Sequence, residues 1–338
     1  MVPKSLAGAF GGSALAGGRT IDPAQWASDQ PVLGLVREAG YAWGSVHDVE
    51  TGDLVSFMRR FPPQADDGHD GTQKSLAGKL IIQSTRDGAQ TLQLCREARG
   101  AAASDDLARE PIEAGVLFAP APGAAGRGLS LEMTPERVHY VEEDLVDLAG
   151  PIACPALQWY LPGGDAALIY LTQTWEVTGT VLGRPVRGFL FWEEAYMPPG
   201  GRLYVAKDPL HDVAYTTWYS WANHYADGTV EVGHFLFGQR DFHVGLVASS
   251  DGSVRAARRM DAIVTRDAEG YWHQGLTYDL DGEAWVCEPD PRGRMIGLGP
   301  IPNPQQEGRV RRAGDDRAVE AWMAWGESVP AHGESRIQ

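Results

Sequence analysis

The stretch from Leu168 to Phe242, with His243 directly after it, holds the densest group of side chains that could transfer a proton or bind a ligand. The group contains carboxylates, imidazoles, aromatic rings and a guanidinium: Glu176, Glu193, Glu194, Tyr196, Trp218, Trp221, His224, His234, Arg240 and His243. Carboxyl and imidazole groups act as acids and bases near neutral pH when burial or neighbouring charges shift their pKa. This combination indicates acid–base chemistry in aromatic surroundings.

Residues 189–196 are expected to form a strand that carries two consecutive glutamates. One face would present Leu190, Trp192, Glu194 and Tyr196, and the other Phe191, Glu193 and Ala195. Both faces mix large apolar groups with a carboxylate, so the alternation does not decide which face points inward. If Glu194 shares a cavity with Trp192 and Tyr196, desolvation would raise its pKa and allow it to donate a proton. The alternative is a Glu194 that faces solvent or pairs with Arg184 or Arg187.

His234 is a single polar residue on an apolar stripe, because Val230, Val232 and Leu236 share its face of an expected strand. One interpretation is a hydrogen-bonded core histidine, and the other is an acid–base group in a cavity. Trp218 and Trp221 lie on opposite faces of a regular strand, so at most one of them lines a given cavity.

The predicted site has two parts. The expected catalytic residues are Glu194, Glu176, His234 and Tyr196, with Glu194 or Glu176 as the proton donor. The expected substrate-binding residues are Trp192, Trp218, Trp221, His224 and Arg240. Aromatic walls suit an apolar ligand and could stabilise a cation over a ring face. Ordinary packing would explain the tryptophans equally well, and Arg240 could instead form a salt bridge at the end of a strand.

Alternating apolar and polar residues between turn sequences predict antiparallel strands over most of the chain. Glycines inside strand patterns, at 188, 233 and 238, indicate bulges or close backbone approach that would curve a sheet. Only the end has a helical pattern, since apolar residues at 318, 319, 322 and 325 predict a short helix within Asp315–Trp325. We therefore expect a mostly β fold with two lipocalin-like β-barrel or β-sandwich domains and a short C-terminal helix.

The 338 residues are enough for two domains. We expect a flexible leader over residues 1–20, an N-terminal β domain over 21–154 and a C-terminal lipocalin-like domain over 155–338. Near the start, Asp22 and Pro23 fit the N-cap and first position of a short helical turn.

Composition excludes several classes of protein. The net charge of −16 is unfavourable for binding nucleic acid or an anionic membrane surface. No run approaches about 18 apolar residues, so no membrane span is expected. Three widely spaced cysteines and the absence of nucleotide or metal motifs predict free thiols, no cofactor and no metal, in the cytoplasm.

The second half resembles a known family on a limited set of residues. These are Trp175–Val181, Gly183–Gly188, Glu193–Tyr196 and Trp218–Trp221, followed by an Asp227–Gly228 turn. The stretch is similar to two-domain, lipocalin-like proteins that include carotenoid 1,2-hydratases (hydroxyneurosporene synthases) and AttH-like proteins. Glu193, Glu194 and Tyr196 stand near the place where that family usually has Asp-His-x-Trp. The resemblance implies two β domains with an apolar cavity, and some relatives act on polyenes as cyclases without a cofactor.

These observations favour a cofactor-independent enzyme that acts by acid–base chemistry on a hydrophobic small molecule, isoprenoid- or polyketide-like. The expected reaction is hydration, isomerisation or cyclisation, with the ligand in a barrel mouth or at the domain interface. The alternative is a non-catalytic carrier of a lipid or isoprenoid, in which the carboxylates merely pair with arginines. An interaction protein without a cavity is the third possibility.

Overall fold

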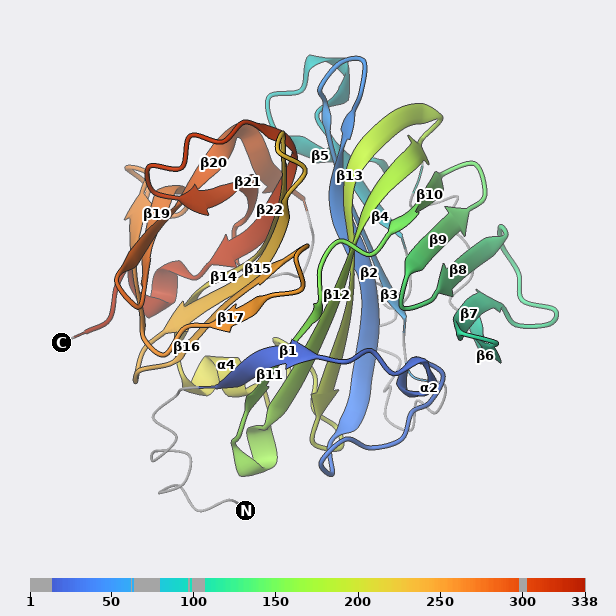
Figure 1. The fold of residues 1–338 in the computed structure, drawn as a ribbon, viewed down its shortest axis with the longest axis horizontal. Coiled ribbons are helices and arrows are strands. Elements are labelled where there is room, and N and C mark those ends of the chain that lie inside the picture. Colours follow the sequence, from blue (N-terminus) through green and yellow to red (C-terminus); the bar gives the residue numbers. More distant parts are fainter. Residues whose placement is uncertain are drawn as a thin grey trace.

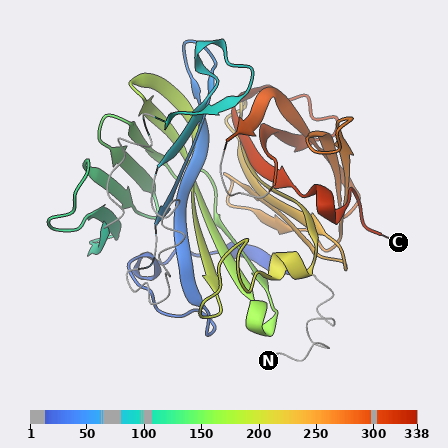
Figure 2. The ribbon, with the colours of Figure 1, turned by 180° about the vertical axis from the view of Figure 1, so that it is seen from behind.

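The computed structural model describes residues 14–61, 63, 80–96, 98, 107–297 and 303–337. Two groups of mostly antiparallel strands lie side by side, one containing β1–β13 and the other β14–β22 (Figure 1). The same division is visible from behind (Figure 2). The prediction of a mostly β fold is confirmed.

The first sheet contains thirteen strands of the described chain. They are β1 (Leu15–Arg19), β2 (Val36–Asp48), β3 (Leu54–Phe61), β4 (Ile81–Ser84), β5 (Leu92–Leu94), β6 (Leu107–Ile112), β7 (Gly115–Pro120), β8 (Leu129–Met133), β9 (Arg137–Glu142), β10 (Val146–Pro151), β11 (Ala156–Leu161), β12 (Leu168–Val181) and β13 (Arg184–Met197). Their order is β6–β7–β8–β9–β10–β12–β13–β2–β3–β4–β5. Strands β11 and β1 extend the sheet from the beginning of β12.

The second sheet has nine described strands. They are β14 (Tyr215–Tyr225), β15 (Val230–Gly238), β16 (His243–Ser249), β17 (Val254–Ala256), β18 (Met260–Arg266), β19 (His273–Leu280), β20 (Glu283–Ile296), β21 (Gln305–Arg312) and β22 (Val319–Ser328). Their order is β17–β16–β15–β14–β22–β21–β20–β19–β18. One short parallel pairing, of β5 with β20, joins the two sheets. Within the described ranges, no strand pairing closes either sheet into a barrel.

Helical structure is limited to short turns in the described residues. They are α2 (Pro23–Trp26), α4 (Pro209–Asp212) and three 3₁₀ turns, Arg86–Gly88, Gly164–Ala166 and Pro330–His332. Asp22 caps α2 as predicted, because its Oδ1 accepts a hydrogen bond of 3.0 Å from the Ala24 N–H. No helix in the part of the chain described above is long and apolar enough to cross a membrane.

The hairpin of β12 and β13 is the centre of the first sheet, and β13 also pairs with β2 along almost its whole length. Alternate residues of a strand point to opposite faces. In β2 and β13, odd-numbered residues such as Trp43 and Phe191 therefore pack in a core shared by the two sheets, whereas in β12 the even-numbered Tyr170 does so. Even-numbered residues of β2 and β13, such as Ala42 and Leu190, pack in the first sheet's own core. The second sheet has a separate core of its own, which includes Trp221 and Trp285.

The predicted close approaches are present at all three glycines, and a Cβ at Gly238 would lie 2.7 Å from the Tyr215 Cα of β14. A Cβ at Gly188 would overlap the Ser45 carbonyl oxygen of β2, and a Cβ at Gly233 would overlap the Trp221 ring. The absence of a side chain at Gly188 allows β13 to approach β2 closely. The absence of a side chain at Gly233 allows the Trp221 indole to pack against β15.

Three expectations about organisation require correction. Residues 15–19 of the expected leader form β1, while residues 1–13 lie outside the described residues. The predicted helix within Asp315–Trp325 is wrong, because Val319–Ser328 is strand β22, and only the 3₁₀ turn Pro330–His332 follows it. The chain passes from the first sheet to the second between β13 and β14, so the expected boundary at 154/155 falls inside the first sheet.

Candidate functional site

The interface between the two sheets is lined by aromatic side chains from both. Trp159 of β11 stacks on Tyr170 of β12 with ring centroids 5.4 Å apart, and Trp218 of β14 meets Tyr170 edge-on at 4.9 Å. Further along, Trp43 of β2 meets Trp325 of β22 edge-on at 5.2 Å. All five side chains are buried. The stretch 168–242 thus does not form one domain. It supplies Tyr170 to the first sheet's side of the interface and Trp218 to the second sheet's side.

Glu193 is the carboxyl that β13 directs into this interface. Its side chain is buried, and the Tyr170 hydroxyl donates to Oε2 at 2.6 Å. Thr172 at 3.5 Å and Ser220 of the second sheet at 3.4 Å donate to Oε1. Burial raises the pKa of Glu193 to about 7, although the Tyr170 hydroxyl, the Trp43 indole and the two smaller hydroxyls lower it in part. No ion pair among the described residues includes Glu193, so both its protonated and ionised forms are populated at neutral pH.

His234 lies beside the same aromatic cluster, on the second sheet. The Trp218 indole N–H donates to its Nε2 at 2.5 Å, which assigns the imidazole proton of the neutral ring to Nδ1. Burial lowers the pKa of His234 to about 3, so the ring is neutral at physiological pH. Its Nδ1 is buried without a hydrogen-bond partner. The site therefore has a neutral N–H donor close to Tyr170, whose ring centroid is 5.7 Å from the imidazole.

Glu327 is a second buried carboxyl of the interface, on β22. The hydroxyls of Tyr204 and Tyr215 donate to Oε1 at 2.7 and 2.8 Å. The amides of Asn303 and Gln305 donate to Oε2 at 3.2 and 2.5 Å. Burial raises its pKa, and these four donors lower it in part. Both oxygens are thus satisfied by neutral donors, which fits a structural role.

Glu194, one residue after Glu193, points to the opposite face of β13. Its Oε1 pairs with Nη1 of Arg37 at 3.1 Å and accepts the Trp192 indole N–H at 3.2 Å. Arg37 also donates to the Tyr196 hydroxyl at 3.0 Å. Glu194 thus has a buried cationic partner, in contrast to Glu193.

Glu194 and Trp192 line a small pocket on this side of the first sheet, together with Arg19, Ile21, Trp26, Ala156, Leu171, Thr172 and Gln173. The pocket has about 190 Å³ of empty space, which includes its opening to solvent. It is separate from the aromatic interface, so the structure does not bring the predicted residues Glu194, Tyr196 and Trp192 together with His234 and Trp218.

Glu176 and His224 meet at the rim between the two sheets. Nδ1 of His224 lies 2.8 Å from Oε2 of Glu176, and Arg187 donates to Oε1 at 2.7 Å. The Glu176 side chain is 17% exposed, and its arginine partner is 33% exposed. These residues form an ion-paired cluster across the edge of the interface.

Trp221 and Arg240 do not join either cluster. Trp221 is buried inside the second sheet, where its ring lies 5.2 Å from that of Trp285. Arg240 is exposed in the turn after β15 and has a positive φ of 53°. Trp218 alone of the two strand tryptophans reaches the interface, consistent with their expected opposite faces.

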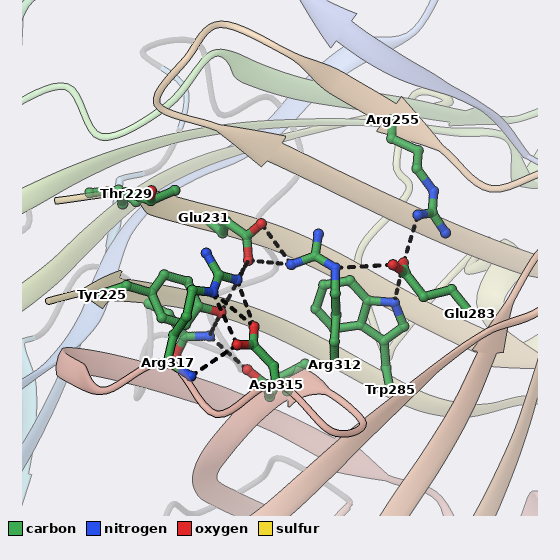
Figure 3. Close-up of polar contacts among 12 residues, drawn as sticks. Tyr225, Thr229, Glu231, Arg255, Glu283, Trp285, Arg312, Asp315 and Arg317 are labelled. Atoms are coloured by element: carbon green, nitrogen blue, oxygen red, sulfur yellow. Dashed lines mark hydrogen bonds and ion pairs between the residues drawn. The ribbon is translucent and has the colours of Figure 1, made fainter. Parts of the chain in front are cut away.

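Another buried glutamate, Glu231, shows how the second sheet neutralises a carboxylate. Arg312 donates to both oxygens of Glu231 at 2.7 Å, and Arg317 donates to Oε2 at 3.3 Å (Figure 3). Arg312 also pairs with Glu283 at 3.1 Å, so the charges in this cluster satisfy one another. Glu231 therefore has two cationic partners, unlike Glu193. Across the described ranges, no group of three or more His, Cys, Asp and Glu side chains could hold a metal ion.

Sequence reasoning missed Tyr170, Trp159, Trp43, Glu307 and Glu327, and it counted Glu193 among the groups capable of chemistry without giving it a role in the site. The aromatic residues had the right pattern for strands, but nothing in the sequence assigns them to a shared face. Glu307 and Glu327 lie on either side of the expected helix within Asp315–Trp325, in a part of the chain to which no site residue was assigned. These two glutamates can be identified as interface residues only when the pairing of β21 with β22, and the packing of both strands against the first sheet, are known.

Comparison with solved structures agrees with the fold. An AttH-type protein from Nitrosomonas europaea superposes with a TM-score of 0.51 at 14% identity, covering 92% of this chain and 97% of that chain. Kievitone hydratase from Nectria haematococca gives 0.43 at 8% identity, covering 89% and 91%. CghA with bound Sch210972 gives 0.35 at 11% identity, covering 86% and 88%. No protein-family profile and no curated protein matches the sequence. The chain therefore has the two-part, lipocalin-like fold of the AttH-type structure.

Proposed function

We propose that the protein is a cofactor-independent enzyme that protonates a hydrophobic small molecule at the interface between its sheets. The observation that carries this proposal is Glu193, a buried carboxyl with a pKa of about 7 and no cationic partner, in an aromatic interface. Efficient general acids have pKa values near the operating pH. In this proposal Glu193 replaces Glu194 and Glu176 as the proton donor.

In the proposed mechanism, the Glu193 carboxyl donates its proton to a carbon–carbon double bond or to an oxygen of the ligand. The positive charge that develops lies against the ring faces of Trp159, Tyr170 and Trp218, whose π electrons stabilise cations. The cation then adds water and releases a proton, or loses a proton from a neighbouring carbon, or is attacked by a second double bond to give a cyclic cation that in turn loses a proton. The resulting carboxylate accepts a hydrogen bond of 2.6 Å from Tyr170 and is returned to its acid form by the released proton. These outcomes correspond to hydration, isomerisation and cyclisation.

The neutral His234 has a positioning role in this scheme. Its Nδ1–H has no partner, and the Trp218 indole fixes its orientation through Nε2. A neutral imidazole next to the reacting cation avoids charge repulsion, and its N–H can orient a ligand oxygen.

The second candidate is a carrier that binds the same class of molecule without changing it. One observation favours it, since Glu194 and Glu176 are paired with Arg37 and Arg187. The carrier hypothesis predicts such paired carboxylates.

The decisive experiment begins with native mass spectrometry of the purified protein and chemical identification of any small molecule that co-purifies. That molecule is then incubated with wild-type protein and with Glu193→Gln. We expect turnover by the wild type and a loss of about 10²–10⁴-fold in the variant. Glu288→Gln, which changes a glutamate in an exposed pair with Arg311, is the matched control. A ligand recovered unchanged from the wild type would establish the carrier, and full turnover by Glu193→Gln would exclude Glu193 as the acid.

A further inference from the structure

A third buried carboxyl of the interface, Glu307, has a different environment from Glu193 and Glu327. Glu307 lies on β21 opposite Trp325 of β22, and its side chain is 1% exposed. Its Oε1 accepts hydrogen bonds from Ser56 of β3, at 2.8 Å, and from Ser45 of β2. These two serines are register partners in the first sheet. A carboxyl of the second sheet thus reaches into the first sheet.

The other carboxyl oxygen, Oε2, is buried and has no hydrogen-bond partner. Because Oε1 already accepts two hydroxyl hydrogens, a neutral Glu307 carries its proton on Oε2. Burial raises the pKa of Glu307 to about 8, with the Ser56 hydroxyl and the Ala324 N–H lowering it in part, so the neutral form predominates at pH 7. The result is an O–H donor in an apolar interface without an acceptor. Buried donors of this kind are rare and costly unless a partner binds to them.

Glu307 and Glu193 lie at two ends of one aromatic surface. The register partner of Glu193 on β2 is Tyr41, and Ser45 lies four residues further along. At a rise of about 3.3 Å per residue, this separation corresponds to about 13 Å. Between the two ends, Trp43 lies 4.9 Å from the Phe191 ring and 5.2 Å from the Trp325 ring.

We propose that Glu307, held by Ser45 and Ser56, is a binding subsite for a neutral oxygen atom of the substrate. This inference rests on the proposed function, because it concerns the molecule that Glu193 protonates. The substrate class is then an elongated apolar molecule with a hydroxyl or carbonyl oxygen about 13 Å from the protonated atom. An anionic end group does not fit, since no ion pair in the described chain supplies a cation to Glu307, and an unpaired buried charge is costly.

The binding test uses farnesol and farnesene, which have the same fifteen-carbon skeleton with and without a hydroxyl group. Their dissociation constants are measured by isothermal titration calorimetry on full-length wild type and Glu307→Met, an apolar replacement of similar size. We expect the wild type to bind farnesol about tenfold more tightly than farnesene, the value of one net hydrogen bond. Glu307→Met should bind both equally, with unchanged affinity for farnesene. Glu288→Met, at the exposed pair with Arg311, should keep the preference.

Equal affinities in the wild type, no binding of either compound, or a preserved preference in Glu307→Met would overturn the inference. Infrared spectra of the wild type and of Glu307→Gln, which keeps a polar side chain of the same size, support the binding data. In infrared difference spectra at pH 7, farnesol should shift a C=O band of a protonated carboxyl in the wild type, and the band should be absent from Glu307→Gln. A wild-type band that farnesol leaves unshifted counts against the subsite.

This experiment separates the subsite from the catalytic proposal. Glu193→Gln should retain the farnesol preference, because Glu193 lies at the other end of the surface. If the preference is present but no turnover is found, Glu307 is the polar subsite of a carrier. If turnover depends on Glu193 while the preference is absent, only the subsite is wrong.

Discussion

Glu193 and Glu194 are consecutive residues of one strand, but the two faces of β13 give them opposite chemistry. Glu194 points to the face of the first sheet that lies away from the second sheet, where the Arg37 guanidinium lies 3.1 Å from its carboxylate. Glu193 is directed into the interface, where only neutral donors contact it. The two carboxyls are about equally buried, at 4% and 0% exposure. Equal burial therefore does not give two carboxyls the same surroundings: a guanidinium contacts Glu194, and neutral hydroxyls contact Glu193.

The largest expected effect comes from removing the cation on the Glu194 side. Arg37→Met leaves a buried carboxylate without its partner and also removes hydrogen bonds to Gln25, Ser28 and Tyr196. We expect the free energy of unfolding to fall by about 3–5 kcal/mol, measured by urea denaturation. Arg311→Met, at an exposed pair, should cost less than about 1 kcal/mol. A small effect at Arg37 would mean that its contact with Glu194 contributes little to stability and that the two faces do not differ as described.

The Glu193 side should instead show a dependence of stability on pH. The pKa of Glu193 is raised from 4.5 to about 7, so between these values the folded state binds more protons than the unfolded state. Stability contributed by this group is therefore present below pH 4.5 and is lost as the pH rises to 7, by up to about 1.4 kcal/mol per unit. Glu193→Gln should remove this part of the slope in unfolding measurements from pH 4.5 to 7. An unchanged slope would contradict the raised pKa.

Tyr170→Phe tests the strongest neutral donor to Glu193. The Tyr170 hydroxyl stabilises the carboxylate through its bond of 2.6 Å, so its removal should raise the pKa of Glu193 further. We expect a stability loss of about 1–2 kcal/mol at pH 8, where Glu193 is ionised, and a smaller loss at pH 5. Equal losses at both values would show that the hydroxyl does not distinguish the two forms. Tyr140→Phe, at the Glu142 pair in the first sheet, provides a buried tyrosine for comparison.

Ser220→Ala is expected to have the smallest effect of the four. Its hydroxyl is the contact between Glu193 and the second sheet, at 3.4 Å, which is a long hydrogen bond. Stability should fall by less than about 1 kcal/mol. The pKa of Glu193 should rise in the same direction as in Tyr170→Phe, but less. A larger effect than that of Tyr170→Phe would reverse the assigned order of the two donors.

The sequence predicts the strands well because alternating residues and turns are local signals. It fails for β22, whose residues after Glu320 are buried on both faces, so that its apolar residues do not alternate and resemble a helical pattern. For the same reason, the sequence does not show which face of β13 points to the interface, because this strand is buried on both faces from Gly188 to Met197. Where both faces are covered, the choice between Glu193 and Glu194 is made by contacts with distant residues.

The surroundings of the candidate site consist of contacts between residues that are far apart in the sequence. The alternation of apolar and polar residues within a strand does not predict such contacts. Arg37 reaches Glu194 from β2, and Glu307 meets Ser45 across 262 positions of the chain. The resemblance in residues 175–228 indicates the fold, and the AttH-type structure agrees with it. The burial of each carboxyl depends on how the two sheets pack, which follows from the whole chain.

The aromatic face between the sheets also has a consequence for biosynthesis. The described strands of the first sheet all precede Pro198, so this sheet leaves the ribosome before its covering partner is made. At 5–20 residues per second, the remaining 141 residues, from 198 to 338, need roughly 7–28 s. During that time Trp43 and Trp159 lack Trp325 and Trp218, the rings of the second sheet that they meet edge-on in the folded structure. A first sheet that forms before its partner would leave these rings exposed, and transiently exposed apolar surface promotes aggregation during synthesis.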